Sequence, residues 1–361
     1  MAKLYLDRVH LGWLSGNHSR GVVDRRPTRS VESPSKWNVG GWTLVGPFDS
    51  GDDGAGEAIG ADMRALRFHA YGGPEQLRID EVPEPHAGPG EIRIKVAAAS
   101  INPFDGKVLR GAMAGGKALA QPTGLGLDGA GVVDEVGEGV TGVAVGDDVF
   151  GLGRQTQAEY AVLTAWAAKP ASLDWGVAGA AGTVSETAIR GLDLLGVGAG
   201  STVLIDGASG GVGAAAVQLA KARGATVLGT ASEQNADYLR EIGAVPISYG
   251  DGLQERLAAA GYPTLDAVFD VAGKTPVAEL IALVADPSQV VSIANFAAGQ
   301  AGARVTTGGE IDKPAALATA ARLLADSQLV LKIQTFPLDR AAEGYAVVLS
   351  GHARGKIVLL P

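Results

Sequence analysis

The segment Thr202–Arg223 (TVLIDGASGGVGAAAVQLAKAR) constrains the fold more than any other part of the chain. A short aliphatic run ends at a glycine-rich turn, and an alanine-rich stretch with helical spacing follows. Glycine lets the turn approach a bound group closely, and a later glycine lets the helix pack against the strand. The helix start presents unpaired N–H groups and the positive end of its dipole. The segment is therefore predicted to be a strand–turn–helix unit that binds phosphate.

The spacing of the glycines matches the dinucleotide-binding pattern of a Rossmann fold. Ala208, Gly210 and Gly213 occupy the three positions of that pattern, between a predicted strand and a predicted helix. The alternative interpretation is a tight structural turn without a ligand. The residues expected to bind the cofactor at this turn are Ala208, Ser209, Gly210, Gly211, Val212 and Gly213.

Composition excludes several classes of function. The 361 residues leave room for about two domains. The net charge of −9 gives no electrostatic basis for binding nucleic acid or an anionic membrane surface. The chain contains no cysteine, which excludes disulfides, thiolate metal ligands and a cysteine nucleophile. No apolar run reaches the roughly 18 residues that a membrane span needs, and we expect a cytoplasmic protein.

The chain divides into segments of different character. Residues 1–62 hold three of the five tryptophans, lack sustained periodicity and end in an acidic, glycine-rich stretch. They are interpreted as an N-terminal extension, either disordered or upstream of a native start at Met63. The segment 63–185 has the closely spaced short strands of a small β-barrel. From 186 to 310, strands and helices alternate, which predicts a doubly wound parallel sheet.

Within the alternating segment, strands are expected at 203–206, 226–230, 266–270 and 290–293. Helices are expected at 213–223, 235–242, 251–260 and 276–284, and another is expected to begin at Thr187. Residues 314–326 form a predicted amphipathic helix, and residues 356–360 form a predicted closing strand.

Five blocks after Met63 resemble the medium-chain dehydrogenase/reductase superfamily, in its zinc-free quinone oxidoreductase branch. The blocks are Tyr71–Leu77 (YGGPEQL), Ala99–Asp105 (ASINPFD), Gly126–Val132 (GLDGAGV) with Val145–Val149 (VGDDV), the glycine-rich turn, and Gly355–Leu359 (GKIVL). The resemblance implies an α/β protein with two domains. A GroES-like β-barrel catalytic domain would comprise 63–185 and be completed by 311–361, and a Rossmann cofactor-binding domain would comprise 186–310.

The resemblance also bears on metal binding. Zinc-using relatives place cysteine where this chain has Asn102, and His-Glu where it has Leu127 and Asp128. The cysteine cluster of the structural zinc is missing as well. Catalytic zinc needs three protein ligands, so no metal site is predicted.

The cofactor is predicted to be NADPH. NAD-preferring sites hold an acidic residue at the end of the second strand, and Ala231 and Ser232 stand there instead. A shift of one residue would bring Glu233 to that position and restore an acid. Asn235 occupies the position of a phosphate-binding lysine in related reductases, and Tyr249 fits the position of their tyrosine. Arg354 or Lys356 is a further candidate for supplying positive charge, with a solvated strand end as the alternative.

Further candidates for cofactor binding follow the helix and strand pattern. Thr187 resembles a threonine near the nicotinamide in this family, and it is also a candidate helix N-cap. Ala272 and Gly273 follow one predicted strand, and Asn295 and Phe296 follow another. Ligands bind at such carboxyl ends in open α/β sheets, although ordinary loops remain the alternative.

Without a Lewis acid, alcohol dehydrogenation is disfavoured and an electron-poor acceptor is favoured. We expect hydride transfer from NADPH to a quinone or an α,β-unsaturated carbonyl. Asn102 is the first candidate donor to the acceptor oxygen, and Lys107 is a second. Tyr71 either borders the cleft or fills a strand–turn junction. Asp105 is expected to anchor its loop by accepting backbone hydrogen bonds.

Two alternatives remain beside this prediction. A short-chain reductase is rejected, because no tyrosine has lysine four residues later. An NADPH-binding protein without catalysis, acting as a redox sensor or structural partner, stays open, and an aldehyde or alcohol substrate is a weaker possibility. Partners are expected to be a small electrophilic acceptor and a second copy in a homodimer.

Overall fold

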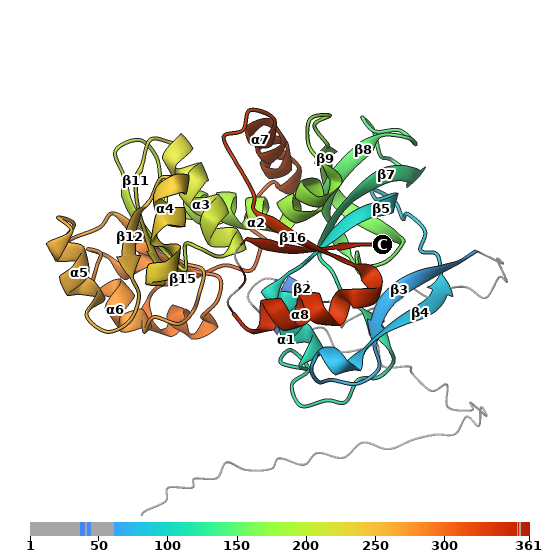
Figure 1. The fold of residues 1–361 in the computed structure, drawn as a ribbon, viewed down its shortest axis with the longest axis horizontal. Coiled ribbons are helices and arrows are strands. Elements are labelled where there is room, and N and C mark those ends of the chain that lie inside the picture. The colour runs from blue at the N-terminus through green and yellow to red at the C-terminus, as the bar shows by residue number, and fades with distance from the viewer. Residues whose placement is uncertain (1–36, 40–41, 45–60, 352, 354) are drawn as a thin grey trace, which may run out of the picture. The chain divides into compact units, whose positions relative to one another are not determined.

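The structure is a computed structural model that describes residues 37–39, 42–44, 61–351, 353 and 355–361 (Figure 1). Before residue 61 it describes only strands β1 (Trp37–Val39) and β2 (Trp42–Leu44), which pair antiparallel. The prediction for residues 1–62 therefore lies almost wholly outside the described residues, and so does Arg354.

A six-stranded parallel sheet forms the predicted doubly wound domain. Its central strand, β10 (Thr202–Asp206), lies between β11 and β13, so the chain reverses its direction of winding there. The four predicted strands are present with ends shifted by one residue, and β12 and β15 extend the sheet at its two edges. The strands beside β10 are, in spatial order, β12 (Val245–Ser248), β11 (Thr226–Ala231), β13 (Ala267–Asp270), β14 (Val290–Ser292) and β15 (Arg304–Val305).

Helices cover both faces of this sheet because successive strand residues point to opposite sides. Val203 and Ile205 pack in a core shared with helices α2, α3 and α7, whereas Leu204 packs in a second core with α5 and α6. The bounds of these helices are α2 (Trp175–Leu194), α3 (Gly211–Ala222), α4 (Ala236–Ile242), α5 (Leu253–Ala259), α6 (Val277–Ile281) and α7 (Lys313–Ala325).

The other domain is the predicted GroES-like barrel, and distant parts of the chain build it. The last strand, β17 (Lys356–Leu360), runs antiparallel to β5 (Ile92–Ile101) and parallel to β16 (Ile333–Pro337) (Figure 1). The sheet continues through β7 (Asp128–Val136), β8 (Asp148–Arg154) and β9 (Tyr160–Ala168), and β9 also pairs with β5. A smaller sheet holds β4 (Leu77–Pro83), β3 (Asp62–Phe68) and β6 (Thr123–Gly124), and two further helices are α1 (Pro103–Leu109) and α8 (Ala341–Leu349).

The expected start of a helix at Thr187 is wrong. Helix α2 begins twelve residues earlier, after Asp174, whose side chain accepts a hydrogen bond from the Val177 N–H at 2.9 Å. Glycine-rich sequence hid this start, although the glycines have a packing reason. A Cβ at Gly179 would lie 2.7 Å from the Ala98 carbonyl oxygen, and one at Gly182 would lie 2.7 Å from that of Gly151. The expected domain boundary at 185/186 consequently falls inside α2.

Among the described residues, no helix is both long and apolar enough to cross a membrane.

Substitution of Gly213 by alanine tests the close approach of α3 to its strand. A Cβ there would lie 2.3 Å from the Gly207 carbonyl oxygen, so G213A is expected to lower the free energy of unfolding by about 1–3 kcal/mol in urea. G198A is the control, since a Cβ at Gly198 has no neighbour within 4 Å. Equal stability of the two variants would contradict the packing argument.

Candidate functional site

The glycine turn has the geometry of a phosphate cradle. Gly207 has a φ of +92°, which glycine adopts without strain, and its N–H donates to Thr230 Oγ1 at 2.8 Å. The first backbone bond of α3 runs from the Ala214 N–H to the Gly210 carbonyl, so the N–H groups of the preceding turn point out of the helix. At Gly210 a Cβ would meet only the Gly207 oxygen, at 3.6 Å. The turn therefore fits the diphosphate of a dinucleotide.

The C-terminal segment closes onto this turn. Gly355 forms a parallel bridge with Gly210, and its φ of +74° again needs glycine. The next side chain, Lys356, crosses the start of α3, where a Cβ on Gly211 would lie 2.8 Å from Lys356 Cδ. The last strand of the barrel and the cofactor turn thus meet through three glycines and one lysine.

Beside that lysine lies a buried polar cluster, defined by Ser100, Asn102, Asp105, Asp128 and Lys356, all at most 4% exposed. Lys356 Nζ donates to Asn102 Oδ1 at 2.6 Å. Asn102 Nδ2 donates to Asp128 Oδ1 at 2.8 Å and to Ser100 Oγ at 3.2 Å. Ser100 Oγ in turn donates to Asp128 Oδ1 at 2.5 Å. The side chain of Asn102 is therefore saturated by protein partners.

The second carboxyl of the cluster, Asp105, accepts the backbone N–H of Asn102 at 2.7 Å and that of Gly126 at 3.1 Å. This confirms its expected role as an anchor of the loop. Burial raises the pKa of Asp105 to about 7, against the lowering effect of the Asn102 N–H, and nearby Asp128 raises it further. Burial lowers the pKa of Lys356, and Asp128 and Asp105 oppose that shift. The cluster thus holds groups that exchange protons more readily than exposed ones.

The other two catalytic candidates lie apart from this cluster. Lys107 Nζ lies 5.6 Å from the ring centroid of Phe296, so a side chain of α1 faces one that follows β14. Tyr71 is half-buried, its ring centroid is 5.9 Å from that of Phe68, and a Cβ on Gly111 would lie 2.8 Å from the Tyr71 ring. Its surroundings are those of a packed strand–turn junction.

At the end of β11, three polar side chains gather beside the glycine turn. Asn235 Nδ2 lies 3.2 Å from Ser232 Oγ and 3.4 Å from Ser209 Oγ, and Asn235 Oδ1 is buried without a partner among the described residues. Tyr249 is 62% exposed, and its N–H donates to the Ala231 carbonyl at 3.4 Å. No carboxylate takes part in these contacts, because Glu233 is exposed.

Arg256 supports the Tyr249 loop and was not anticipated from the sequence. Its guanidinium donates to the carbonyl oxygens of Ser248, Gly250 and Asp251 at 2.6–2.9 Å. It thereby holds both neighbours of Tyr249 in place.

Thr187 lies in the middle of α2 beside a buried ion pair. Its hydroxyl donates to Glu186 Oε2 at 3.1 Å, and Arg190 Nε donates to Glu186 Oε1 at 2.8 Å. Arg190 also donates to Thr306 Oγ1 at 2.6 Å, which ties α2 to the segment after β15. The sequence analysis missed this pair, although the i, i+4 spacing of Glu186 and Arg190 on a helix was a visible signal.

Carboxyl and hydroxyl groups hold the two loops that were predicted from strand ends. Asp270 Oδ1 accepts the N–H groups of Ala272 at 3.1 Å and Gly273 at 2.7 Å, and Asp270 Oδ2 accepts from Ser292 Oγ at 2.7 Å. Ser292 Oγ in turn accepts the N–H of Asn295 at 2.9 Å. Neither Asp270 nor Ser292 was singled out from the sequence, since a buried strand end carries no spacing signal.

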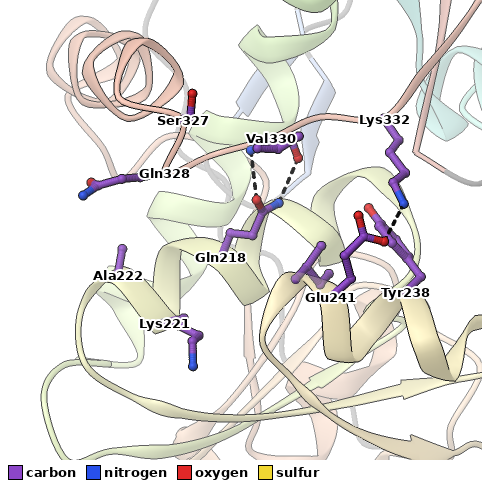
Figure 2. Close-up of a pocket in the computed structure, with 10 residues that line it drawn as sticks. Gln218, Lys221, Ala222, Tyr238, Glu241, Ser327, Gln328, Val330 and Lys332 are labelled. Atoms are coloured by element: carbon purple, nitrogen blue, oxygen red, sulfur yellow. Dashed lines mark hydrogen bonds and ion pairs between the residues drawn. The ribbon is translucent and has the colours of Figure 1, made fainter.

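Figure 2 shows a different hollow, of about 390 Å³, bounded by α3, α4 and residues 327–332. Gln218 bonds both backbone groups of Val330 across it, at 2.9 Å each. Lys332 Nζ lies 2.9 Å from Glu241 Oε2 and 4.2 Å from the centroid of the Tyr238 ring. None of the predicted site residues lines this hollow.

The fold and the glycine turn define a two-domain, dinucleotide-binding class of protein, and comparison with known proteins agrees. The family pattern of an alcohol dehydrogenase GroES-like domain matches residues 88–197, and that of a zinc-binding dehydrogenase matches residues 211–314. A chloroplast envelope quinone oxidoreductase homolog of Arabidopsis thaliana is 30% identical over 326 residues, covering 83% of this chain and 98% of that protein. The chain therefore belongs to the medium-chain dehydrogenase/reductase superfamily, among the quinone oxidoreductases.

Two further comparisons concern the cofactor. A chloroplastic NADPH-dependent alkenal/one oxidoreductase of Arabidopsis thaliana is 30% identical, covering 85% of this chain and 82% of that protein. The structure of an Escherichia coli quinone oxidoreductase complexed with NADPH is similar, with a TM-score of 0.72, 25% identity, and coverage of 82% of this chain and 100% of that one. These relatives support a nicotinamide cofactor and a small-molecule acceptor.

The raised pKa of Asp105 predicts a pH dependence of stability. An aspartate in an unfolded chain has a pKa of about 3.9. Between that value and the native pKa of about 7, the native state holds a proton that the unfolded state has lost. The contribution of Asp105 to the free energy of unfolding therefore falls with rising pH, by about 1.4 kcal/mol per unit at most, and stays constant above pH 7.

The measurement compares urea unfolding of wild type and D105N between pH 4.5 and 8. The stability of wild type relative to D105N is expected to decrease up to about pH 7 and then to level off. D237N is the control, because the Asp237 side chain is 99% exposed. A difference between wild type and D105N that is independent of pH would contradict the assigned pKa.

Proposed function

We propose that the protein reduces a quinone or an α,β-unsaturated carbonyl with NADPH, without a metal ion. The glycine turn, closed by the Gly355–Gly210 bridge, is the observation that carries this proposal. The relatives named above add the acceptor class, since one is a quinone oxidoreductase homolog and another an alkenal/one oxidoreductase.

Each part of the site has a role in this reaction. Bound NADPH supplies the hydride. The N–H groups at the start of α3 would hold its diphosphate, and Thr187 with Asn295 and Phe296 would border its nicotinamide. Quinones and enones are electron-poor already, so the protein needs chiefly to orient the two reactants and to exclude water. Lys107, facing Phe296 at 5.6 Å, would lie at the acceptor side of this arrangement.

The end of β11 favours NADPH over NADH. Ser232, Asn235 and Ser209 offer hydroxyl and amide groups where a carboxylate would repel a 2′-phosphate. Tyr249, held between carbonyls that Arg256 fixes, is exposed beside them. The unpartnered Asn235 Oδ1 marks a buried polar atom that a hydroxyl of the ribose would satisfy.

An NADPH-binding redox sensor or structural partner without turnover is the second candidate. The saturated side chain of Asn102 favours it, because that side chain has no donor left for an acceptor oxygen. A homodimer and a cytoplasmic location remain predictions from the sequence and the family.

The proposed function is tested by oxidation of NADPH and NADH by the purified full chain. The acceptors are 1,4-benzoquinone, 9,10-phenanthrenequinone and a simple enone, each with and without a metal chelator. NADPH-selective turnover that the chelator leaves unchanged is the expected result. Binding of NADPH without turnover on any acceptor would favour the redox sensor instead.

Replacing Ser232 by glutamate tests the assignment of the 2′-phosphate site. A carboxylate there would repel the phosphate and accept the 2′-hydroxyl of NADH. S232E is expected to raise the KM for NADPH about 10- to 100-fold, which corresponds to roughly 1.4–2.7 kcal/mol, and to lower that for NADH. E233Q is the control, because Glu233 is exposed in the adjacent turn. If E233Q rather than S232E changes the preference, the acid position has been misassigned by one residue.

A further inference from the structure

We propose that Lys356 is the group that stabilises the charge developing on the acceptor oxygen and then protonates it. This inference rests on the proposed function, because it names the proton source for that same reaction. The sequence analysis considered Lys356 only as a ligand of the cofactor.

The hydrogen bonds of the buried polar cluster single out this lysine. Asn102 commits both amide hydrogens to Asp128 and Ser100, and Ser100 commits its hydroxyl hydrogen to Asp128. An ammonium group carries three N–H bonds, and the structure describes one acceptor for Lys356 Nζ, which is Asn102 Oδ1 at 2.6 Å. Lys356 is therefore the member of the cluster that retains side-chain N–H donors without an acceptor among the described residues.

The position of the ammonium connects the two halves of the site. Its aliphatic chain crosses Gly211 at the start of α3, where the cofactor diphosphate is expected. Its nitrogen contacts Asn102, which directly precedes α1, the helix that carries Lys107. A positive charge at this point lies between the cofactor turn and the acceptor side.

The surroundings keep this charge available instead of neutralising it fully. From β7, Asp128 favours the charged lysine, but three other donors already share its carboxylate: Asn102 Nδ2, Ser100 Oγ and the Thr183 N–H at 2.9 Å. From α1, Asp105 also favours it, with a carboxyl that two backbone N–H groups hold. From α8, the Tyr345 hydroxyl donates to Gln157 Oε1 at 2.7 Å, and burial raises the pKa of that phenol well above its usual value.

Desolvation makes the ammonium a better acid than an exposed lysine, because burial lowers its pKa. Hydride transfer to a carbon of the acceptor displaces an electron pair onto the carbonyl oxygen. One N–H bond of Lys356 then breaks as the new O–H bond forms, which yields an enol or a hydroquinone and a neutral amine. The amine regains its proton from water, so the step needs no further reactant.

The test uses K356M and K356R in the full chain, with K95M as the matched control. Lys95 is an exposed lysine on the neighbouring strand β5. K356M is expected to lower kcat by about 10²- to 10⁴-fold, the usual contribution of a positioned general acid, while the Kd for NADPH changes little. K356R keeps the charge and is expected to restore part of kcat. K95M is expected to behave as wild type.

The pH profile gives a readout that a purely structural role would not move. In wild type, kcat is expected to fall as pH rises through the pKa of Lys356, below the ordinary lysine value of 10.5. This basic limb should shift to higher pH in K356R, because a guanidinium stays protonated. An unchanged limb in K356R would overturn the proposal.

A second measurement does not depend on turnover or on the folding of K356M. NMR of wild type labelled with ¹³C at lysine Cε follows the protonation of Lys356, whose signal is assigned by its loss in K356R. The expected result is titration below 10.5, and titration at or above that value would overturn the proposal.

The outcomes separate this proposal from the proposed function. No turnover by wild type on any acceptor refutes the proposed function, and the proton-donor role fails with it. Turnover by wild type with an unchanged kcat in K356M refutes the role of Lys356 alone. If K356M instead raises the KM for NADPH and leaves kcat unchanged, Lys356 is a cofactor ligand and the proposal is wrong.

Discussion

The contact between the last strand and the glycine turn is the constraint on which the rest of the structure depends. Strand β17 pairs with β5 inside the barrel sheet, yet the residue before it, Gly355, bridges to Gly210 at the start of α3. The two chain segments are 145 residues apart in sequence, and a side chain larger than hydrogen at Gly355 would collide with the Lys332 carbonyl at 2.0 Å. The barrel and the parallel sheet are therefore joined where the cofactor is expected to bind.

That junction brings a buried lysine beside two buried carboxyls, which is costly for stability. Removing charges from water costs several kcal/mol per ion unless good hydrogen bonds compensate. Here Asp128 accepts three hydrogen bonds and Asp105 accepts two, so both are well satisfied, while Lys356 has a single acceptor. Buried groups with shifted pKa values gather at functional sites more often than elsewhere. The imbalance at Lys356 is consistent with a role in the reaction that a purely structural ion pair would not require.

Local sequence signals predicted much of the fold. The glycine turn, the alternation of strands and helices after it, and the closing strand depend on residues that are neighbours in sequence, and all are present. Helix α2 was the main error, because glycines that let it touch the carbonyls of Ala98 and Gly151 resemble a loop in the sequence. Its true start at Trp175 depends on tertiary packing, which propensity does not capture.

The candidate site was predictable only where one segment forms it. Residues Ala208 to Gly213 lie together because they are consecutive. The buried polar cluster instead joins Asn102, Asp128 and Lys356 from three distant segments, and no spacing rule relates them. The orientation of Asn102 illustrates the limit, because its position was predicted near the reaction but its amide faces Asp128 and Ser100. Hydrogen-bond saturation is a property of the folded site and is invisible in the sequence.

A crystal structure of the full chain with NADPH tests the central claim most directly. The account predicts the diphosphate against the N–H groups of Gly211 and Val212, the 2′-phosphate beside Ser232 and Asn235, and the nicotinamide facing the side of the barrel that carries Asn102 and Lys356. Absence of NADPH from this turn at saturating concentration, or its binding in another place, would contradict the account.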